Sequence, residues 1–269
     1  MCGCQKKSPA IYGFSESSKT FFEEIRRFRH DRKQNFAAPV RTRVILYLSA
    51  KAARKIRVSG YDSYLRVAAE WEAEFARGRK LHGDKIHCGK GCCDCCSQMF
   101  QITEVEAAYI SSAVKQLPEE QRAWLQARAR EYLAQREKLL ASRNVPDAWG
   151  SLPPPGLRLP CPALEDGACF IYNRRPMICR RYGIPLYNPQ KPERIFACEL
   201  NFKPGEEIID SGLIEIHTRL YGDWAAVQAE YNQQGGRRDP KPLTVARAIL
   251  EDFEPYLPGS APESPAEAR

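Results

Sequence analysis

Apolar side chains recur at helical spacing in several long stretches of the chain. Residues 15–34 place their phenylalanines on one helical face, with acidic residues early and basic residues late, as the helix dipole favours. Similar spacing predicts helices over residues 43–56 and from residue 62 to about residue 79, the latter capped by Asp62. We therefore expect residues 1–87 to form an N-terminal helical region.

Helix signals return after residue 100. Thr103 is followed three residues later by Glu106, which is the spacing of a capping box. Pro118 precedes a long charged segment, and proline is well tolerated in a first helical turn. Further helices are expected within residues 206–233, where two glycines weaken the prediction of an unbroken helix, and over residues 243–253.

Two stretches lack this periodicity. Residues 82–100 hold five cysteines and three glycines and are too irregular for an amphipathic element, and the proline-rich residues 151–160 predict an extended connector. The predicted fold is mainly α, a helical domain around an irregular, cysteine-rich metal-binding core with few short strands, which are confined to residues 161–198. This core spans residues 88–200, and it is followed by C-terminal helices over 201–257 and a disordered tail over 258–269.

The cysteine content changes the picture from an ordinary helical protein to a candidate metal protein. The chain has eleven cysteines, and its N-terminus lacks the apolar stretch of a secretory signal peptide. We expect a cytoplasmic protein without a membrane segment, and a reducing cytosol keeps thiols available for metals. No catalytic motif of a common enzyme class accompanies the cysteines.

Nine of the cysteines fall in two groups. Cys92, Asp94 and Cys95 within the CCDC sequence supply a chelating turn, and Gly89 and Gly91 flank it. Because thiolates leave excess negative charge around a divalent ion, nearby cations are expected to stabilise such a site. The candidates in sequence are Lys90, Arg174, Arg175, Arg180 and Arg181.

The pattern of the cysteines resembles the YkgJ-type cysteine-cluster family, also described as CxxCxxCC proteins. The resemblance lies in Cys161-Pro-Ala-Leu, Cys169-Phe-Ile-Tyr172, Arg175-Pro176 and Cys179-Arg180, and Cys198 takes the place of the final cysteine. In the first half, Cys88 sits one residue further upstream than the family pattern, and Cys93 is additional.

The resemblance implies a zinc or iron site, which could be an iron–sulfur cluster, and Cys93 would substitute for a neighbour or remain outside it. Residues that shape the surroundings of the site would be Lys90, Tyr172, Arg175 and Arg180. The ligands it implies are Cys88, Cys92, Cys95, Cys96, Cys161, Cys169, Cys179 and Cys198.

Several alternatives stay open at this point. All-sulfur coordination suits both zinc and iron–sulfur clusters, and one or two centres are compatible with eight cysteines. A similar cysteine cluster in flagellin lysine methylases suggests an enzyme that modifies a protein, and the CCDC sequence also fits a redox pair. The formal net charge of +8, with a basic cluster in residues 26–33, suggests a nucleic-acid-binding protein as a less favoured alternative. No role is expected for Cys2, Cys4 or the histidines, of which His87 is expected to face solvent.

Overall fold

The computed structural model describes residues 10–12, 61–89, 91–150, 156–233 and 239–253 of the chain. The prediction of a mainly α fold is confirmed, and the helices expected over residues 15–34 and 43–56 lie outside the described residues. The helices are α2 (Asp62–His82), α3 (Glu104–Lys115), α4 (Glu119–Ser142), α5 (Met177–Arg181), α6 (Leu213–Gln233) and α7 (Val245–Leu250). Short 3₁₀ helices are η1 (Gly83–Lys85), η2 (Cys95–Ser97) and η3 (Tyr172–Arg174).

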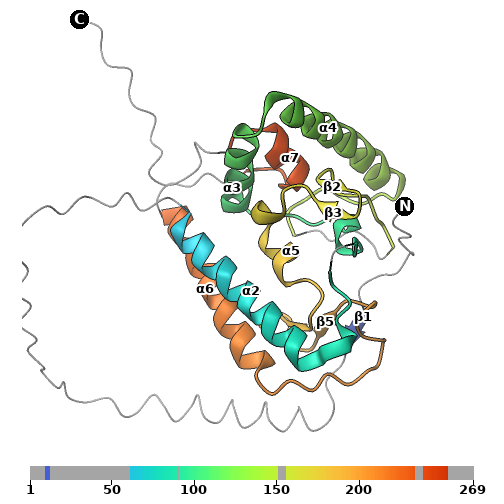
Figure 1. Cartoon of the computed structure of the whole chain (residues 1–269), viewed down its shortest axis with the longest axis vertical. Coiled ribbons are helices and arrows are strands. Elements are labelled where there is room, and N and C mark those ends of the chain that lie inside the picture. The colour runs from blue at the N-terminus through green and yellow to red at the C-terminus, as the bar shows by residue number, and fades with distance from the viewer. Residues whose placement is uncertain (1–9, 13–60, 90, 151–155, 234–238, 254–269) are drawn as a thin grey trace, which may run out of the picture.

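Helices α2 and α6 lie side by side and share the first of two apolar cores (Figure 1). On α2, the buried residues Tyr64, Val67, Ala68 and Trp71 recur at intervals of three and four, so one face of the helix is covered. Leu220 of α6 is fully buried in the same core. Despite the glycine at position 222, α6 is a single helix, because packing outweighs the low helix propensity of glycine.

The second apolar core is formed by α3, α4 and α7 in the other half of the described structure (Figure 1). Leu125, Ala129 and Tyr132 give α4 its buried stripe, and Ile110 of α3 and Ile249 of α7 are completely or almost completely buried against it. The cysteine-bearing segments join the two cores, since Cys88 packs against the first and Cys161 and Cys169 pack against the second.

The predicted helix starts are correct in one case and need a correction in another. Thr103 forms the expected capping box with Glu106, whose carboxylate accepts from the Thr103 amide at 2.7 Å. Asp62 is not the cap of α2, because Tyr61 occupies the N-cap position without a side-chain hydrogen bond. Asp62 instead lies in the first turn, where its negative charge still favours the positive end of the helix dipole.

The strands are short, as expected, but one lies outside the predicted segment. Strands β4 (Leu186–Tyr187) and β5 (Ile195–Ala197) pair antiparallel, and β1 (Ala10–Tyr12) adds to the free edge of β5. The prediction that strands are confined to residues 161–198 is therefore wrong for β1. A three-residue strand has too little periodicity to be seen in the sequence, and its formation depends on backbone pairing with β5.

A buried polar network locks α2, α6 and β4 together. Glu74 accepts from Arg77 at 2.7 Å and contacts His217 Nε2 at 3.0 Å, and the Tyr187 amide donates to His217 Nδ1 at 3.1 Å. Since Nδ1 accepts, Nε2 carries the proton and donates to Glu74. Arg77 also reaches Asp210 at 2.6 Å. His217, which shows no motif in the sequence, therefore serves as a buried connector between three elements.

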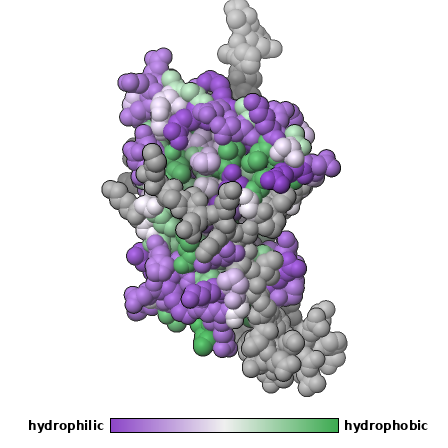
Figure 2. Space-filling view, turned by 90° about the vertical axis from the view of Figure 1, so that its right-hand side faces the viewer, coloured by the Kyte–Doolittle hydropathy of each residue, from purple (hydrophilic) through white to green (hydrophobic). Residues whose placement is uncertain are grey.

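The surface is mostly hydrophilic on the face shown in Figure 2, and smaller hydrophobic areas lie between the hydrophilic ones. The most exposed large apolar side chains in the described segments include Ile209, Tyr172 and Leu81, which are far apart in sequence. None of the helices in the described part of the chain is both long enough and apolar enough to span a bilayer.

Candidate metal centre

The first cysteine segment is a tight turn that leads into η2. The Cys92 amide donates to the Gly89 carbonyl and the Cys96 amide to the Cys93 carbonyl, each at 3.1 Å. Arg158 holds the turn from outside, because it donates to the Asp94 carbonyl at 2.8 Å and forms an ion pair with the Asp94 carboxylate. Asp94 is thus engaged by an arginine and contributes to the shape of the turn.

The second segment begins with a hairpin of β2 (Leu164–Glu165) and β3 (Ala168–Cys169). Its two turn residues, Asp166 and Gly167, both have positive φ, as a two-residue hairpin of this kind requires. The turn packs on the first segment so closely that a Cβ on Gly167 would lie 3.4 Å from the Gly91 Cα. The hairpin turn of the second segment therefore lies in contact with the backbone of the first segment at Gly91.

Backbone hydrogen bonds continue this contact. The Cys161 amide donates to the Cys96 carbonyl at 2.7 Å, and the Leu159 amide donates to the Ser97 carbonyl at 2.9 Å. Cys179 lies on α5, whose first amide, that of Met177, donates to Glu106 at 2.6 Å. Glu106 thus serves both the capping box of α3 and the start of the helix that carries Cys179.

Asn201 connects Cys88, the first of the eight cysteines in the sequence, to Cys198, the last. Its side-chain nitrogen lies 3.4 Å from Cys88 Sγ and donates to the Gly183 carbonyl at 2.7 Å. Its side-chain oxygen accepts from the His87 amide at 3.1 Å, and its backbone amide donates to the Cys198 carbonyl at 2.9 Å. The His87 side chain is exposed, as expected.

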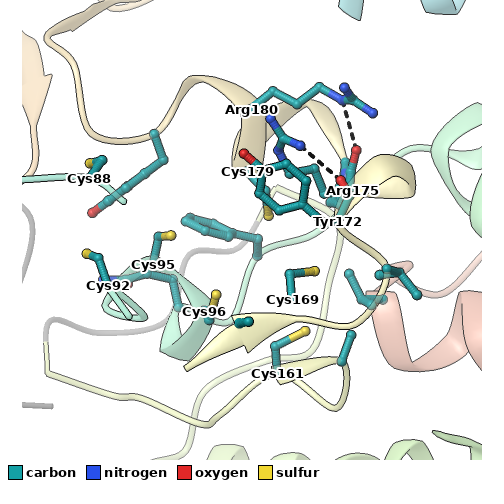
Figure 3. Close-up of a pocket in the computed structure, with 18 of the residues that line it drawn as sticks. Cys88, Cys92, Cys95, Cys96, Cys161, Cys169, Tyr172, Arg175, Cys179 and Arg180 are labelled. Carbon is teal, nitrogen blue, oxygen red and sulfur yellow. Dashed lines mark hydrogen bonds between the residues drawn. The ribbon is translucent and has the colours of Figure 1, made fainter. Parts of the chain in front are cut away.

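All these elements border one cavity of about 460 Å³. Figure 3 shows Cys88, Cys92 and Cys95 on one side of the view, Cys161 and Cys169 on the other, and Cys96 between the two groups. The eight cysteines named from the sequence are all free thiols, whereas the buried Cys93 is disulfide-bonded and stands outside this set. Those lining the cavity are Cys88, Cys92, Cys95, Cys96, Cys161, Cys169 and Cys179, and Cys198 is buried nearby.

The thiols are gathered but are not arranged as ligands. Within the described ranges, no three Cys, His, Asp or Glu side chains lie close enough together to hold a metal ion as they stand. Four sulfurs at the usual zinc distance of about 2.3 Å lie about 3.8 Å from one another, so the side chains must draw together to bind. The donor set itself, seven free thiols that line one cavity and an eighth beside it, fits a thiophilic metal or cluster.

Burial controls the protonation of most of these thiols. It raises the pKa of Cys161 to about 12 and that of Cys198 to about 11, and the neighbouring cysteines add to both effects. Burial likewise raises the pKa of Cys179, and the nearby Cys161, Cys96 and Cys169 reinforce it. A bound cation would have to displace these protons, because metals coordinate the thiolate form.

The pKa values of the adjacent residues Cys95 and Cys96 are shifted in opposite directions. The hydrogen bond between their side chains raises the pKa of Cys95, and burial adds to this. The same hydrogen bond lowers the pKa of Cys96, so Cys96 is the one that gives up its proton first. The sulfurs of the two residues therefore lie within hydrogen-bonding reach of each other.

Of the four arginines expected near the site, Arg175 and Arg180 border the cavity, whereas Arg174 stacks on Tyr109 and Arg181 on Trp71. Arg175 donates to the Tyr172 carbonyl at 2.9 Å and stacks on the Tyr172 ring at 3.8 Å, and the buried Arg180 donates to the Arg175 carbonyl at 3.0 Å (Figure 3). Both arginines also pair with Glu72 of α2. Lys90, which was also expected near the site, lies outside the described residues.

Sequence reasoning missed two residues that shape the site. Asn201 has no motif, and only its position three residues after Cys198 could have drawn attention to it. Gly183 has a φ of +121°, and a Cβ there would fall closer than 3.0 Å to Cys88 Sγ. Both lie at the same end of the cavity and hold Cys88 in place.

Gly183→Ala is expected to disturb this end of the site. A side chain at positive φ is strained and would overpack against Cys88, so we expect a loss of about 1–3 kcal/mol in the free energy of unfolding. Urea unfolding followed by circular dichroism measures this change. The matched control is Gly222→Ala on the exposed side of α6, which has open space and should stabilise the protein by up to about 1 kcal/mol. Equal behaviour of the two variants would contradict the proposed contact with Cys88.

Comparison with known proteins points to the same segments. Residues 87–194 match the model of the CxxCxxCC family, whose description is "putative zinc- or iron-chelating domain". No curated protein and no solved structure matches the chain. The matched interval holds seven of the eight free thiols, and Cys198 follows four residues after its end. The resemblance expected from the sequence is thereby confirmed, because the family model matches the segment that holds the cysteines.

Proposed function

We propose that this protein binds zinc or an iron–sulfur cluster through the thiolates of eight cysteines, as a structural or redox metal protein. The observation that carries the proposal is the meeting of seven free thiols, from two distant segments of the sequence, around one cavity, with the eighth, Cys198, close to them. The ligands would be Cys88, Cys92, Cys95, Cys96, Cys161, Cys169, Cys179 and Cys198. The family description, which names zinc or iron chelation, supports the choice of metals.

A metal would stabilise a region that has little regular structure of its own. The hairpin has two residues in each strand, η2 has three residues, and α5 has five. Such short elements form few hydrogen bonds, whereas a structural zinc site in a small domain binds with an apparent free energy of about 10–16 kcal/mol. The metal would therefore fix the two cysteine segments to each other more firmly than their backbone contacts do.

The cavity wall also offers charge compensation. Arg79, Arg175 and Arg180 border the cavity, and eight thiolates around two divalent ions would leave an excess charge of about −4. Burial raises the pKa of both Cys88 and Cys169, and hydrogen bonds from Asn201 and from the Ile171 backbone reduce these increases. The charges of Arg79 on Cys88 and of Arg175 on Cys169 act in the same lowering direction. These guanidinium groups would stabilise the thiolates and tune the affinity or redox potential of the centre.

Anaerobic purification followed by elemental and sulfide analysis tests the proposal. We expect either stoichiometric zinc in a colourless protein, or iron and acid-labile sulfide in a brown one. Cys161→Ser should lower the metal content, because it removes a proposed ligand. Cys93→Ser should leave the metal content unchanged, because Cys93 is disulfide-bonded and is not one of the eight free thiols. A wild-type protein without zinc or iron, even after reconstitution, would contradict the proposed function.

The other functions considered from the sequence have less support. The family description names chelation and no reaction, so a protein-modifying enzyme is not proposed despite the cavity beside the thiols. The basic cluster that suggested nucleic-acid binding, in residues 26–33, lies outside the described residues.

A further inference from the structure

We infer that the eight thiols form two separate four-thiolate centres rather than one shared centre. The first set comprises Cys88, Cys92, Cys95 and Cys198, and the second comprises Cys96, Cys161, Cys169 and Cys179. The inference rests on the proposed function, and it adds the number of metal centres and the division of the ligands between them.

The second set is held together by one compact group of elements. Cys161 and Cys169 belong to the same hairpin, since the Leu164 amide donates to the Cys161 carbonyl at 3.0 Å and Leu164 is the cross-strand partner of Cys169. Cys96 is tied to this hairpin by the 2.7 Å hydrogen bond from the Cys161 amide. Cys179 completes the set from α5, because it lines the same cavity and the charges of Cys161, Cys96 and Cys169 act on it.

The first set is built around Asn201 at the other end of the cavity. The Asn201 backbone amide donates a hydrogen bond to the Cys198 carbonyl, and its side-chain nitrogen contacts Cys88 Sγ. Cys92 follows Cys88 through the Gly89 turn, and the thiol of Cys198 is influenced by both Cys88 and Cys92. Figure 3 shows Cys95 on this side of the cavity, near Cys92.

The division falls between two consecutive residues, Cys95 and Cys96. Both lie on the 3₁₀ helix η2, in which successive side chains point roughly 120° apart. The two sulfurs nevertheless lie within hydrogen-bonding reach of each other, so the two centres would be close neighbours that meet at η2. Cys95 is influenced by Cys179 as well as by Cys92, and its two-residue spacing from Cys92 suits a shared centre with that residue. Each set would also have a cation of its own, Arg79 beside Cys88 and Arg175 beside Cys169.

Each centre would join both cysteine segments. The first set takes three cysteines from residues 88–96 and one, Cys198, from the second segment, whereas the second set takes Cys96 from the first segment and three from the second. Losing one centre would therefore leave the two segments still connected through the other. A single shared centre would have no second connection to remain when its own ligands are removed.

The number of bound ions tests the inference. Co²⁺ is titrated into reduced, metal-free protein under anaerobic conditions, and the sulfur-to-cobalt charge-transfer absorption is followed. The wild type is expected to saturate at two equivalents, and native mass spectrometry should count two ions or two clusters in the protein as purified. Cys198→Ser and Cys161→Ser should each saturate at one tight equivalent, and the double variant should bind none tightly.

Other results would overturn the inference. Saturation of the wild type at one equivalent, or complete loss of tight binding in both single variants, would show a shared centre. If a single variant still binds two equivalents of cobalt, the cysteine that it lacks is not a ligand. A wild type that binds no cobalt, zinc or iron–sulfur cluster, even after reconstitution, would contradict the proposed function itself. The mass of the wild-type protein decides the count even if a single variant fails to fold.

Discussion

Removal of the metal is expected to release the two cysteine segments while the helical cores remain folded. The loops and short elements over residues 88–96 and 161–198 should lose their protection from hydrogen exchange, because coordination would supply most of their stabilisation. Helices α2 and α6 bury a continuous apolar core, including Trp71 and Leu220, and should stay protected. Hydrogen exchange followed by mass spectrometry, before and after treatment with a strong chelator, measures the change for each segment.

A chelator already saturated with zinc is the control for this experiment, because it has the same charge and size without the capacity to remove metal. Returning zinc or iron to the stripped protein should restore protection to the same segments. Unchanged exchange after complete removal of the metal would contradict a structural role for the centre. Loss of protection throughout α2 and α6 would show instead that the first core depends on the metal.

The elements that follow from local pattern were predictable. The helix from Asp62 was expected because its apolar residues recur within one turn of each other, and Thr103 and Glu106 are only three residues apart. The hairpin turn at Asp166 and Gly167 carries a recognised Asp-Gly signal, but two residues on either side are too few for an alternating pattern.

Contacts between distant residues were not predictable in the same way. The eight cysteines could be named because their pattern resembles that of a known family, but which of them meet in space depends on how the hairpin and η2 pack against each other. Asn201 and Cys88 are 113 positions apart, and neither local propensity nor hydrophobic spacing connects them. Glu74 and His217 are 143 positions apart and look ordinary until the fold buries both.

Glu74→Gln is expected to destabilise the first core by about 3 kcal/mol at pH 7. Burial alone would raise the pKa of Glu74, but hydrogen bonds from Arg77 and His217 outweigh it and lower the pKa to about 2. The unfolded value is about 4.5, so the charged form contributes stability that is fully present above about pH 4.5. A difference of about 2.5 pKa units corresponds to about 3 kcal/mol.

The pH dependence follows from the same difference. As the pH falls from about 4.5 to about 2, Glu74 takes up a proton in the unfolded state before the folded one, and its contribution disappears. The difference in unfolding free energy between wild type and variant should therefore shrink over this range, as measured by urea unfolding at each pH. Metal release and other carboxylates act on both proteins, so they cancel in the difference.

Glu70→Gln on the same helix is the matched control. Glu70 pairs with Arg219 at the surface, where about half of the arginine side chain is exposed, and such pairs contribute about 1 kcal/mol or less. This variant should thus lie close to the wild type at every pH. If Glu74→Gln cost no more than Glu70→Gln at pH 7, Glu74 would not be the buried anion that holds Arg77 and His217 together. A cost that persisted unchanged down to pH 2 would instead indicate altered packing, since a packing defect does not titrate.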